Sequence, residues 1–139
     1  MAKRIVKKNK LVKKSRKRVL RTRNAGKWTE AQYFSRIRSA LRRTFRFWEP
    51  MKEALEKASR PSRSENKRLK KEYQCAHCQN WFKRADVEVD HIIPCGSLNS
   101  YEEIVPFLKR LTVEEAGAFQ VLCKPCHLIK TKKDRENGQ

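Results

Sequence analysis

The chain has 139 residues, of which 35 are lysine or arginine and 15 are aspartate or glutamate, so its formal net charge is +20. The excess lies in residues 1–72, which carry 26 basic and 6 acidic side chains, whereas residues 73–139 carry nine of each. No apolar run approaches the roughly 20 residues of a membrane span, and no apolar stretch follows the basic N-terminus as in a secretory signal. We therefore expect neither membrane insertion nor secretion, but a polyanionic partner: nucleic acid or an anionic membrane surface.

Residues 1–27 are predicted to form a basic arm that is disordered when free. The first 24 residues contain 12 lysines or arginines and no acidic residue, so like charges repel and few apolar groups are present to offset the entropy of ordering. Ile5, Val12 and Val19 recur at a seven-residue interval, which would allow a helix to form against a partner.

Residues 28–72 are predicted to form a basic helical segment followed by a linker. Thr29 and Gln32 match a capping box, and a helix is expected from there toward Pro50, because helices usually end before a proline. Apolar residues at steps of three and four predict a packing face made of Tyr33, Phe34, Ile37, Leu41, Phe45 and Trp48. Arginines without any lysine lie mostly elsewhere on this helix and favour contact with phosphates: Arg36, Arg38, Arg42, Arg43 and Arg46.

The segment boundary is placed near Glu72, where the charge balance changes. Before it, a short helix is expected over residues 51–58, and the polar, proline-containing residues 60–66 indicate a linker. After it, runs rich in β-branched and apolar residues predict strands at 87–93 and 119–122.

Residues 73–139 are expected to contain helices as well as these strands. A helical stretch is predicted to open at Ser100, and Pro106 would kink or divide it. A terminal helix is predicted over residues 126–135. The expected fold class is therefore α+β.

Four of the five cysteines form two C-x-x-C pairs, Cys75 with Cys78 and Cys123 with Cys126. Two thiolates at this spacing lie on one tight turn, and two such turns supply the four tetrahedral ligands of a structural Zn²⁺. The alternative is two redox pairs or buried free thiols. Without a secretory signal we expect a reducing cytosol, where clustered cysteines bind metal more often than they form disulfides. The fifth, Cys95, is interpreted as a small half-buried residue.

A second set of candidate residues surrounds two of the three histidines. Asp90 offers an oxygen ligand suited to Mg²⁺ or Mn²⁺, and His127 offers an imidazole ligand beside a zinc cysteine. His91 could take a proton from water at neutral pH, so these groups suffice to hydrolyse a phosphodiester. Neighbouring residues on a strand point to opposite faces, so Asp90 and His91 converge only if the strand bends there. His77, inside the first cysteine pair, is expected to face water.

These residues form one continuous pattern: Asp90-His91-Ile92-Ile93-Pro94 between the cysteine pairs, then His127, Lys130 and Thr131 after the last cysteine. The pattern resembles the HNH endonucleases, and it covers about residues 73–133. The resemblance implies a ββα-metal (HNH) module stapled by a four-cysteine zinc site, preceded here by the basic helical segment and the basic arm. It implies a general base at His91, ligands of a catalytic divalent ion at Asp90 and His127, and a phosphate contact at Lys130.

The chain departs from the family pattern at one position. The middle asparagine of the family usually lies five residues before the third cysteine, where this chain has Ala118. Gln120 and Glu88 are candidate substitutes.

Two functions are expected from these residues. The first is a metal-dependent DNA endonuclease of a phage or bacterium, active in the cytoplasm of the bacterial or infected cell, with the arm and arginine-rich helix holding phosphates. The second is a non-catalytic zinc-containing nucleic-acid-binding protein, in which Ala118 marks a lost or repurposed site. A membrane-surface or purely structural protein would require neither Asp90 nor His91.

Overall fold

The computed structural model describes residues 18–138. The predicted disordered arm lies mainly in residues 1–17, outside the described residues. The end of that predicted arm is not disordered: strand β1 (Arg21–Arg23) pairs antiparallel with β2 (Trp28–Thr29). Arg23 fixes this hairpin to the next helix, because its guanidinium donates two hydrogen bonds, of 2.6 and 2.7 Å, to the carboxylate of Glu30.

Helix α1 (Glu30–Thr44) begins as the capping box predicts. The Thr29 hydroxyl accepts from the backbone N–H of Gln32, and the Gln32 side chain accepts from the backbone N–H of Thr29. The helix ends earlier than predicted, at Thr44, and α2 (Glu49–Lys57) starts after a short turn. Pro50 lies in the first turn of α2, where a missing N–H costs no helical hydrogen bond, so this proline starts the second helix.

The apolar face of α1 packs against helix α3 (Ile104–Leu111) and the loop before it, which confirms that face as a packing surface. Ile37, Leu41 and Phe45 cover a buried cluster composed of Cys95, Leu98, Phe107 and Leu111. Pro106 neither kinks nor divides α3, because it lies in the first turn, where its N–H would have no helical partner. Cys95 is 2% exposed and belongs to this core, so it is more deeply buried than expected.

The predicted linker is partly a strand. Strand β3 (Ser59–Pro61) pairs antiparallel with β4 (Lys71–Gln74), and β4 pairs antiparallel with β5 (Trp81–Phe82). This sheet crosses the boundary placed near Glu72. The division into an arm, a helical segment and a C-terminal domain stays a prediction, but the last two share both a sheet and a hydrophobic cluster.

The third sheet is formed by β6 (Val87–His91) and β7 (Phe119–Cys123), which pair antiparallel with Asp90 opposite Gln120. A 3₁₀ turn precedes each strand, at Arg84–Asp86 and Ala116–Ala118. Helix α4 (Lys124–Glu136) follows β7 directly. Both predicted strands and the terminal helix are therefore present, with ends that differ by one or two residues from the predicted ones.

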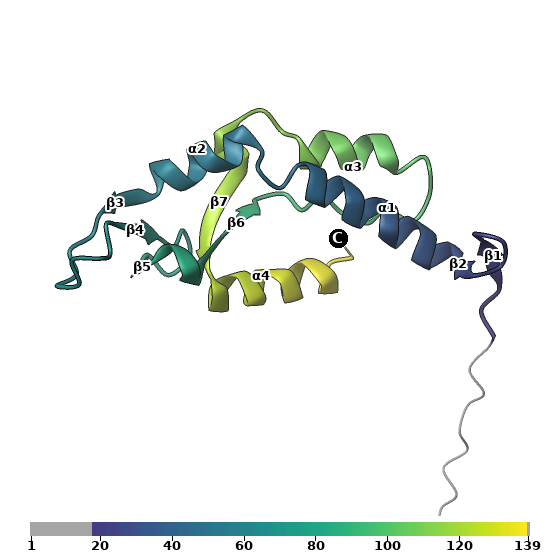
Figure 1. Ribbon diagram of the computed structural model, residues 1–139, viewed down its shortest axis with the longest axis horizontal. Helices are drawn as coiled ribbons and strands as arrows, with labels where there is room; N and C mark the ends of the chain where they lie inside the picture. Colours follow the sequence, from purple (N-terminus) through teal and green to yellow (C-terminus); the bar gives the residue numbers. More distant parts are fainter. Residues whose placement is uncertain (1–17, 139) are drawn as a thin grey trace, which may run out of the picture.

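Residues 18–138 form a mixed α+β structure of four helices and small sheets. Strand β7 runs from α2 to the start of α4, and α1 and α3 lie together on one side (Figure 1). No helix in the described part of the chain has the length and apolar character needed to cross a membrane.

Candidate metal centre and active site

The four paired cysteines meet at one point. Cys75 follows β4, Cys78 lies in the next turn, Cys123 ends β7, and Cys126 lies in the first turn of α4. Their sulfurs all lie within 4.8 Å of one another, and the Sγ atoms of Cys78 and Cys123 are 3.9 Å apart. Tetrahedral zinc with Zn–S bonds of about 2.3 Å places its sulfurs about 3.8 Å apart. The cluster therefore has the geometry to hold a structural metal ion such as zinc.

Backbone hydrogen bonds bring the two cysteine turns together. The Ala76 N–H donates to the Val121 carbonyl across 2.8 Å and joins the first turn to β7. The Gln79 N–H donates to the Cys75 carbonyl and closes that turn, where Gln79 has a φ of 62°. All five cysteines are free, and the paired ones converge on each other across the pairs, which favours a metal site over two separate redox pairs.

The thiols of the cluster differ in their readiness to ionise. Burial alone would raise the pKa of Cys75, but hydrogen bonds from the backbone of Cys123, Cys78 and His77 outweigh it and lower this pKa to about 6. The contact with the Cys123 sulfur, together with burial, raises the pKa of Cys126 to about 12. The fold itself thus favours the thiolate of Cys75 over that of Cys126.

His77 faces water and also contacts the cysteine cluster. Its side chain is exposed as expected, yet its Nδ1 atom lies 3.4 Å from the Cys126 sulfur. Its place inside a C-x-x-C pair does not reveal this contact, because the contact depends on the second cysteine turn folding over the first.

Asp90 and His127 meet, although 36 residues separate them in the chain. Asp90 is on β6 and His127 is on α4, and the distance between Asp90 Oδ1 and His127 Nε2 is 3.7 Å. The other oxygen, Oδ2, accepts from Lys130 Nζ at 3.1 Å and from the Gln120 amide at 3.3 Å. Lys130 and His127 reach the same carboxylate because residues three apart share a helix face.

The charge of Lys130 is shared between two carboxylates. Its ammonium lies 2.7 Å from Asp134 Oδ2 as well as 3.1 Å from Asp90. Partial burial alone would lower the pKa of Lys130, but the hydrogen bonds to Asp134 and Asp90 outweigh it and raise this pKa. Two carboxylates and one ammonium carry a net charge of −1, so the group retains negative charge next to His127.

His91 lies on the opposite face of β6 from Asp90. Alternation along the strand turns Val87 and His91 into the buried face, and His91 is 9% exposed. Its Nε2 atom is 3.2 Å from the Leu111 carbonyl, and its ring centre is 4.7 Å from that of Phe119. A carbonyl only accepts, so Nε2 carries the proton and Nδ1 keeps the lone pair in neutral His91.

Burial also controls the charge of His91. It lowers the pKa of this imidazole, while the Leu111 carbonyl and the negative charge of Asp90 act in the opposite direction. The positive charges of Arg42 and Lys130 add to the lowering. His91 is therefore held neutral near pH 7, and it lies within electrostatic reach of Asp90 despite facing the other way.

Gln120 and Glu88 are the candidate substitutes for the motif asparagine, and only one of them lies near Asp90. Ala118 itself offers only its backbone, whose carbonyl accepts from the Ile92 N–H at 2.9 Å. Gln120 lies directly opposite Asp90 in the strand pair and donates to its carboxylate. Glu88 is exposed and lies opposite Leu122. Of the two, Gln120 contacts the Asp90 site.

The five arginines of the predicted helix have different surroundings, and Arg46 lies just beyond the end of α1. None of them forms an ion pair within residues 18–138. Arg36 lies over the Trp28 ring at 4.1 Å, and Arg46 lies over Phe47 at 4.3 Å. Arg42 lies 5.5 Å from the centre of the Phe107 ring, and its charge reaches His91. Sequence periodicity does not single out Arg42, because its position depends on how α1 packs on α3.

Comparisons with protein-family models, with curated proteins and with solved structures found no match for this chain. The likeness to the HNH endonucleases therefore rests on the motif residues, and the activity that it implies is treated below as a proposal.

Proposed function

We propose that this protein is a metal-dependent endonuclease of the HNH type that hydrolyses phosphodiester bonds in DNA. The ββα module would consist of β6, β7 and α4, which follow one another with one antiparallel pair and one helix. The observation that carries the proposal is the contact between Asp90 and His127 across 3.7 Å. A carboxylate and an imidazole from different elements meet, and a buried, neutral histidine lies on the other face of the same strand. Together these are the kinds of group that metal-assisted hydrolysis uses.

Asp90 and His127 fit a divalent cation such as Mg²⁺ or Mn²⁺. Ligands of an octahedral ion with bonds of about 2.05 Å lie roughly 2.9 Å apart when adjacent and about 4.1 Å apart when opposite. The observed 3.7 Å is longer than the adjacent spacing, so the two side chains would move closer together to bind one ion. When bound there, the ion would neutralise charge on the phosphate and on the leaving oxygen. We infer zinc at the cysteine cluster, because four thiolates select it over harder ions.

His91 would act on the water. Its Nδ1 lone pair accepts a proton as the water oxygen attacks phosphorus, while Nε2 keeps its hydrogen bond to Leu111 and holds the ring in place. The bond from phosphorus to the leaving oxygen would then break, and that oxygen would take a proton from solvent, to which His91 later returns its own. The imidazolium that forms is stabilised by the nearby charge of Asp90. The products are a phosphomonoester and a hydroxyl group.

The electropositive groups around this site are suited to a phosphate. Lys130 lies beside Asp90, and the charge of Arg42 reaches His91 from the other side. We expect Arg42→Gln to slow DNA cleavage about tenfold, because a fixed cation beside the reacting phosphate stabilises the charge that develops there. Arg46→Gln, which removes an arginine stacked on Phe47, is the matched control. Single-turnover nicking rates that fall equally in both variants would contradict a special role for Arg42.

The activity is tested by incubating supercoiled plasmid with the protein and Mg²⁺ or Mn²⁺. We expect nicked or linear product from the wild type, and a loss of at least about a hundredfold in Asp90→Asn, because charge compensation by the ion is removed. Asp86→Asn is the control, since Asp86 pairs with Lys83 away from this site. Wild-type protein that leaves plasmid intact with either metal, or cleavage that survives in Asp90→Asn, would refute the proposal.

A non-catalytic nucleic-acid-binding protein is the second candidate, and two observations favour it. Ala118 replaces the motif asparagine, and Lys130 and Gln120 both bind one oxygen of Asp90. This candidate predicts tight DNA binding without cleavage, and one zinc per chain without a second metal site. In either case the reduced cysteines suit the cytoplasm of a bacterial or phage-infected cell.

A further inference from the structure

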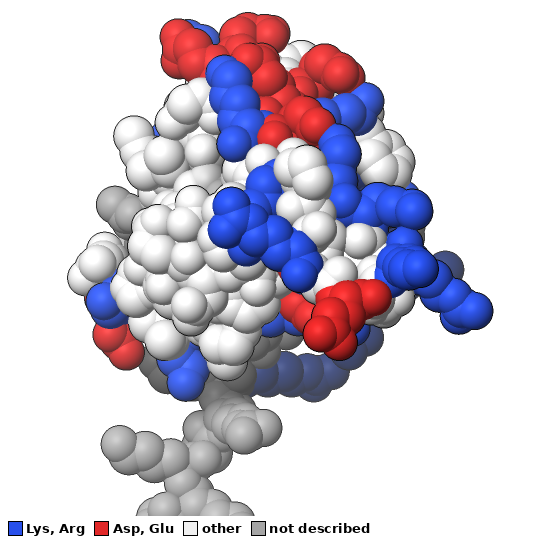
Figure 2. All heavy atoms as spheres, turned by 90° about the vertical axis from the view of Figure 1, so that its left-hand side faces the viewer, with Lys and Arg blue, Asp and Glu red and all other residues white. Residues whose placement is uncertain are grey.

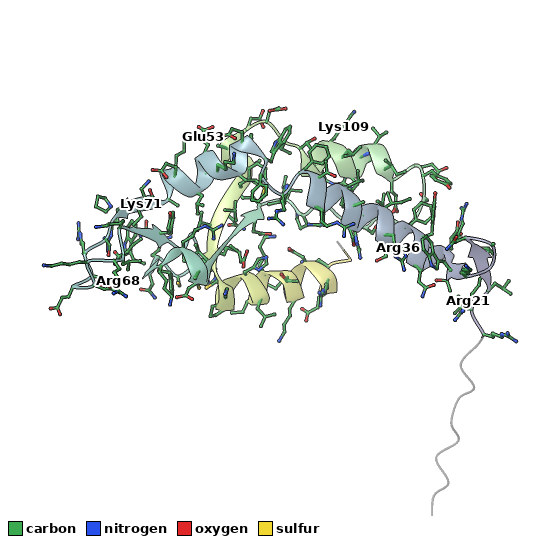
Figure 3. All side chains as sticks on the ribbon, viewed as in Figure 1. Arg21, Arg36, Glu53, Arg68, Lys71 and Lys109 are labelled. Carbon is green, nitrogen blue, oxygen red and sulfur yellow. The ribbon has the colours of Figure 1, made fainter. Side chains whose placement is uncertain are left out.

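We propose that the loop of residues 62–70 between β3 and β4, here called the basic loop, binds the phosphate backbone of duplex DNA. This inference rests on the proposed function in one respect, namely that nucleic acid is the partner. It adds a contact surface in a region where the sequence predicts only a linker. Arg68 of this loop lies toward the opposite end of the molecule from Arg36 of α1 (Figure 3).

The first observation is a set of exposed positive charges with no acidic partner. The loop has one acidic residue, Glu65, and its four basic side chains are exposed and form no ion pair within the described residues: Arg63, Lys67, Arg68 and Lys70. The neighbouring helix α2 is different, because its Lys52 and Lys57 pair with Glu49 and Glu53 at 2.7 Å each. Clustered like charges repel, and a phosphate backbone relieves that repulsion.

The second observation is that this polar loop is ordered by its own side chains. The backbone N–H of Ser64 donates to the Ser62 hydroxyl, that of Asn66 donates to the Ser64 hydroxyl, and that of Arg68 donates to the Asn66 side chain. The Ser62 N–H also donates to the Lys70 carbonyl across 3.0 Å and closes the loop. A loop that is already ordered loses less conformational entropy when it binds a ligand, so its positive charges are held in place before the ligand arrives.

The third observation is the rigid base of the loop. Glu72 accepts hydrogen bonds from the Arg60 guanidinium and from the Ser62 hydroxyl at 3.1–3.3 Å. Burial alone would raise the pKa of Glu72, but these hydrogen bonds outweigh it and lower that pKa, so the carboxylate stays charged. Arg60 also lies 3.6 Å from the centre of the Trp81 ring. Since β4 leads directly into Cys75, the loop is anchored next to the cysteine cluster.

The placement of the loop suits a ligand that spans the molecule. Arg68 lies at one end of the longest axis and Arg21 at the other, with β6 and α4 between them (Figure 3). On the face at the loop's end, the largest group of acidic side chains lies at the top, and most basic side chains lie below it, with smaller acidic groups lower down (Figure 2). Glu53 of α2 is on the upper side in Figure 3, whereas Arg68 is lower, so a polyanion would approach from below α2. A duplex contacted at both ends would pass the Asp90 site.

The test compares two double variants in DNA binding without added Mg²⁺ or Mn²⁺. Lys67→Gln with Lys70→Gln removes two unpaired charges from the basic loop, and Lys52→Gln with Lys57→Gln removes two charges that are paired with glutamates. Each phosphate contact contributes about 0.9 to the slope of log affinity against log salt. We expect the loop variant to lower the slope by about 1.8, so that wild type loses about tenfold more affinity than the variant between about 50 and 200 mM salt. The control should keep the wild-type slope.

The outcomes separate this inference from the nuclease proposal. A loop variant with the wild-type salt slope on a duplex of about three helical turns overturns the inference, whether or not the protein cleaves plasmid. A reduced slope in a protein that cleaves nothing supports the inference and leaves only the nuclease proposal refuted. Loop-dependent binding to vesicles of anionic lipid, with no loop-dependent binding to the duplex, assigns the surface to a membrane and overturns it. Zinc content and circular dichroism spectra equal to those of wild type are required of both variants.

Discussion

Replacing His91 with glutamine is expected to slow plasmid nicking by about 10²–10⁴-fold while DNA binding stays within about twofold of wild type. The loss follows from removing the group whose Nδ1 atom would accept the proton of the attacking water. Glutamine is preferred to alanine because its amide N–H can still donate to the Leu111 carbonyl, to which His91 Nε2 is hydrogen-bonded at 3.2 Å. The measurement is the single-turnover rate of conversion of supercoiled plasmid to nicked plasmid.

The structural role of His91 requires its own control, since the side chain is 9% exposed and packs near Phe119. A drop in cleavage accompanied by a lower melting temperature or by lost zinc would point to damaged folding instead of lost chemistry. His91→Ala, which leaves a cavity, should lose stability as well as activity. Cleavage by folded His91→Gln at the wild-type rate would show that another group takes the proton.

Replacing Cys75 with serine is expected to unfold the part of the molecule that contains β4–β7 and α4. Structural zinc binding provides roughly 10–16 kcal/mol in small zinc domains, which matches or exceeds the whole folding free energy of about 5–15 kcal/mol of a typical domain. Cys75 is fully buried, and its sulfur receives several hydrogen bonds from backbone groups. Serine is a poor zinc ligand, so the cluster loses one of its four donors. Circular dichroism melting and zinc content per chain provide the measurement.

Cys95→Ala is the matched control for Cys75→Ser. Cys95 is also buried, at 2% exposure, but it lies in the cluster with Phe107 and Leu111, away from the other cysteines. We expect it to cost about 1 kcal/mol, with one zinc per chain retained. Adding a strong chelator to wild-type protein should reproduce the unfolding of Cys75→Ser. A Cys75→Ser protein that melts as wild type does would show that the cluster is not structural.

The sequence predicts those features of this fold that depend on local interactions. The start of α1 is confirmed to the residue, because a capping box forms between Thr29 and Gln32, which are three residues apart. The packing face of that helix is also confirmed, because the period of the helix repeats within a few residues. The ends of elements are predicted less well. Pro50 could end one helix or start another, and in the structure it lies in the first turn of α2.

For the candidate metal ligands too, the sequence predicts local features and the tertiary structure adds the contacts between distant segments. The C-x-x-C spacing predicts each cysteine turn by itself, and the structure adds that the two turns meet within 4.8 Å. Strand alternation predicts that Asp90 and His91 face opposite ways unless the strand bends, and the strand alternates regularly through His91, so it does not turn both side chains toward one ion as the motif implies. The local pattern does not reveal that Gln120 contacts Asp90, because that contact needs the register of β6 against β7.

By itself the sequence determines where the charge lies, which residues can bind metal, and where α1, α2, α4, β6 and β7 lie to within a few residues, because each depends on neighbours within a few positions. The tertiary structure alone decides that Asp90 meets His127 and that the predicted linker is part of a basic hairpin. The first outcome depends on β6 pairing with β7 across 27 intervening residues, and the second on β3 pairing with β4 across the nine residues of the basic loop. The free energy of such pairing comes from burial and hydrogen bonds between distant segments, which no local pattern encodes.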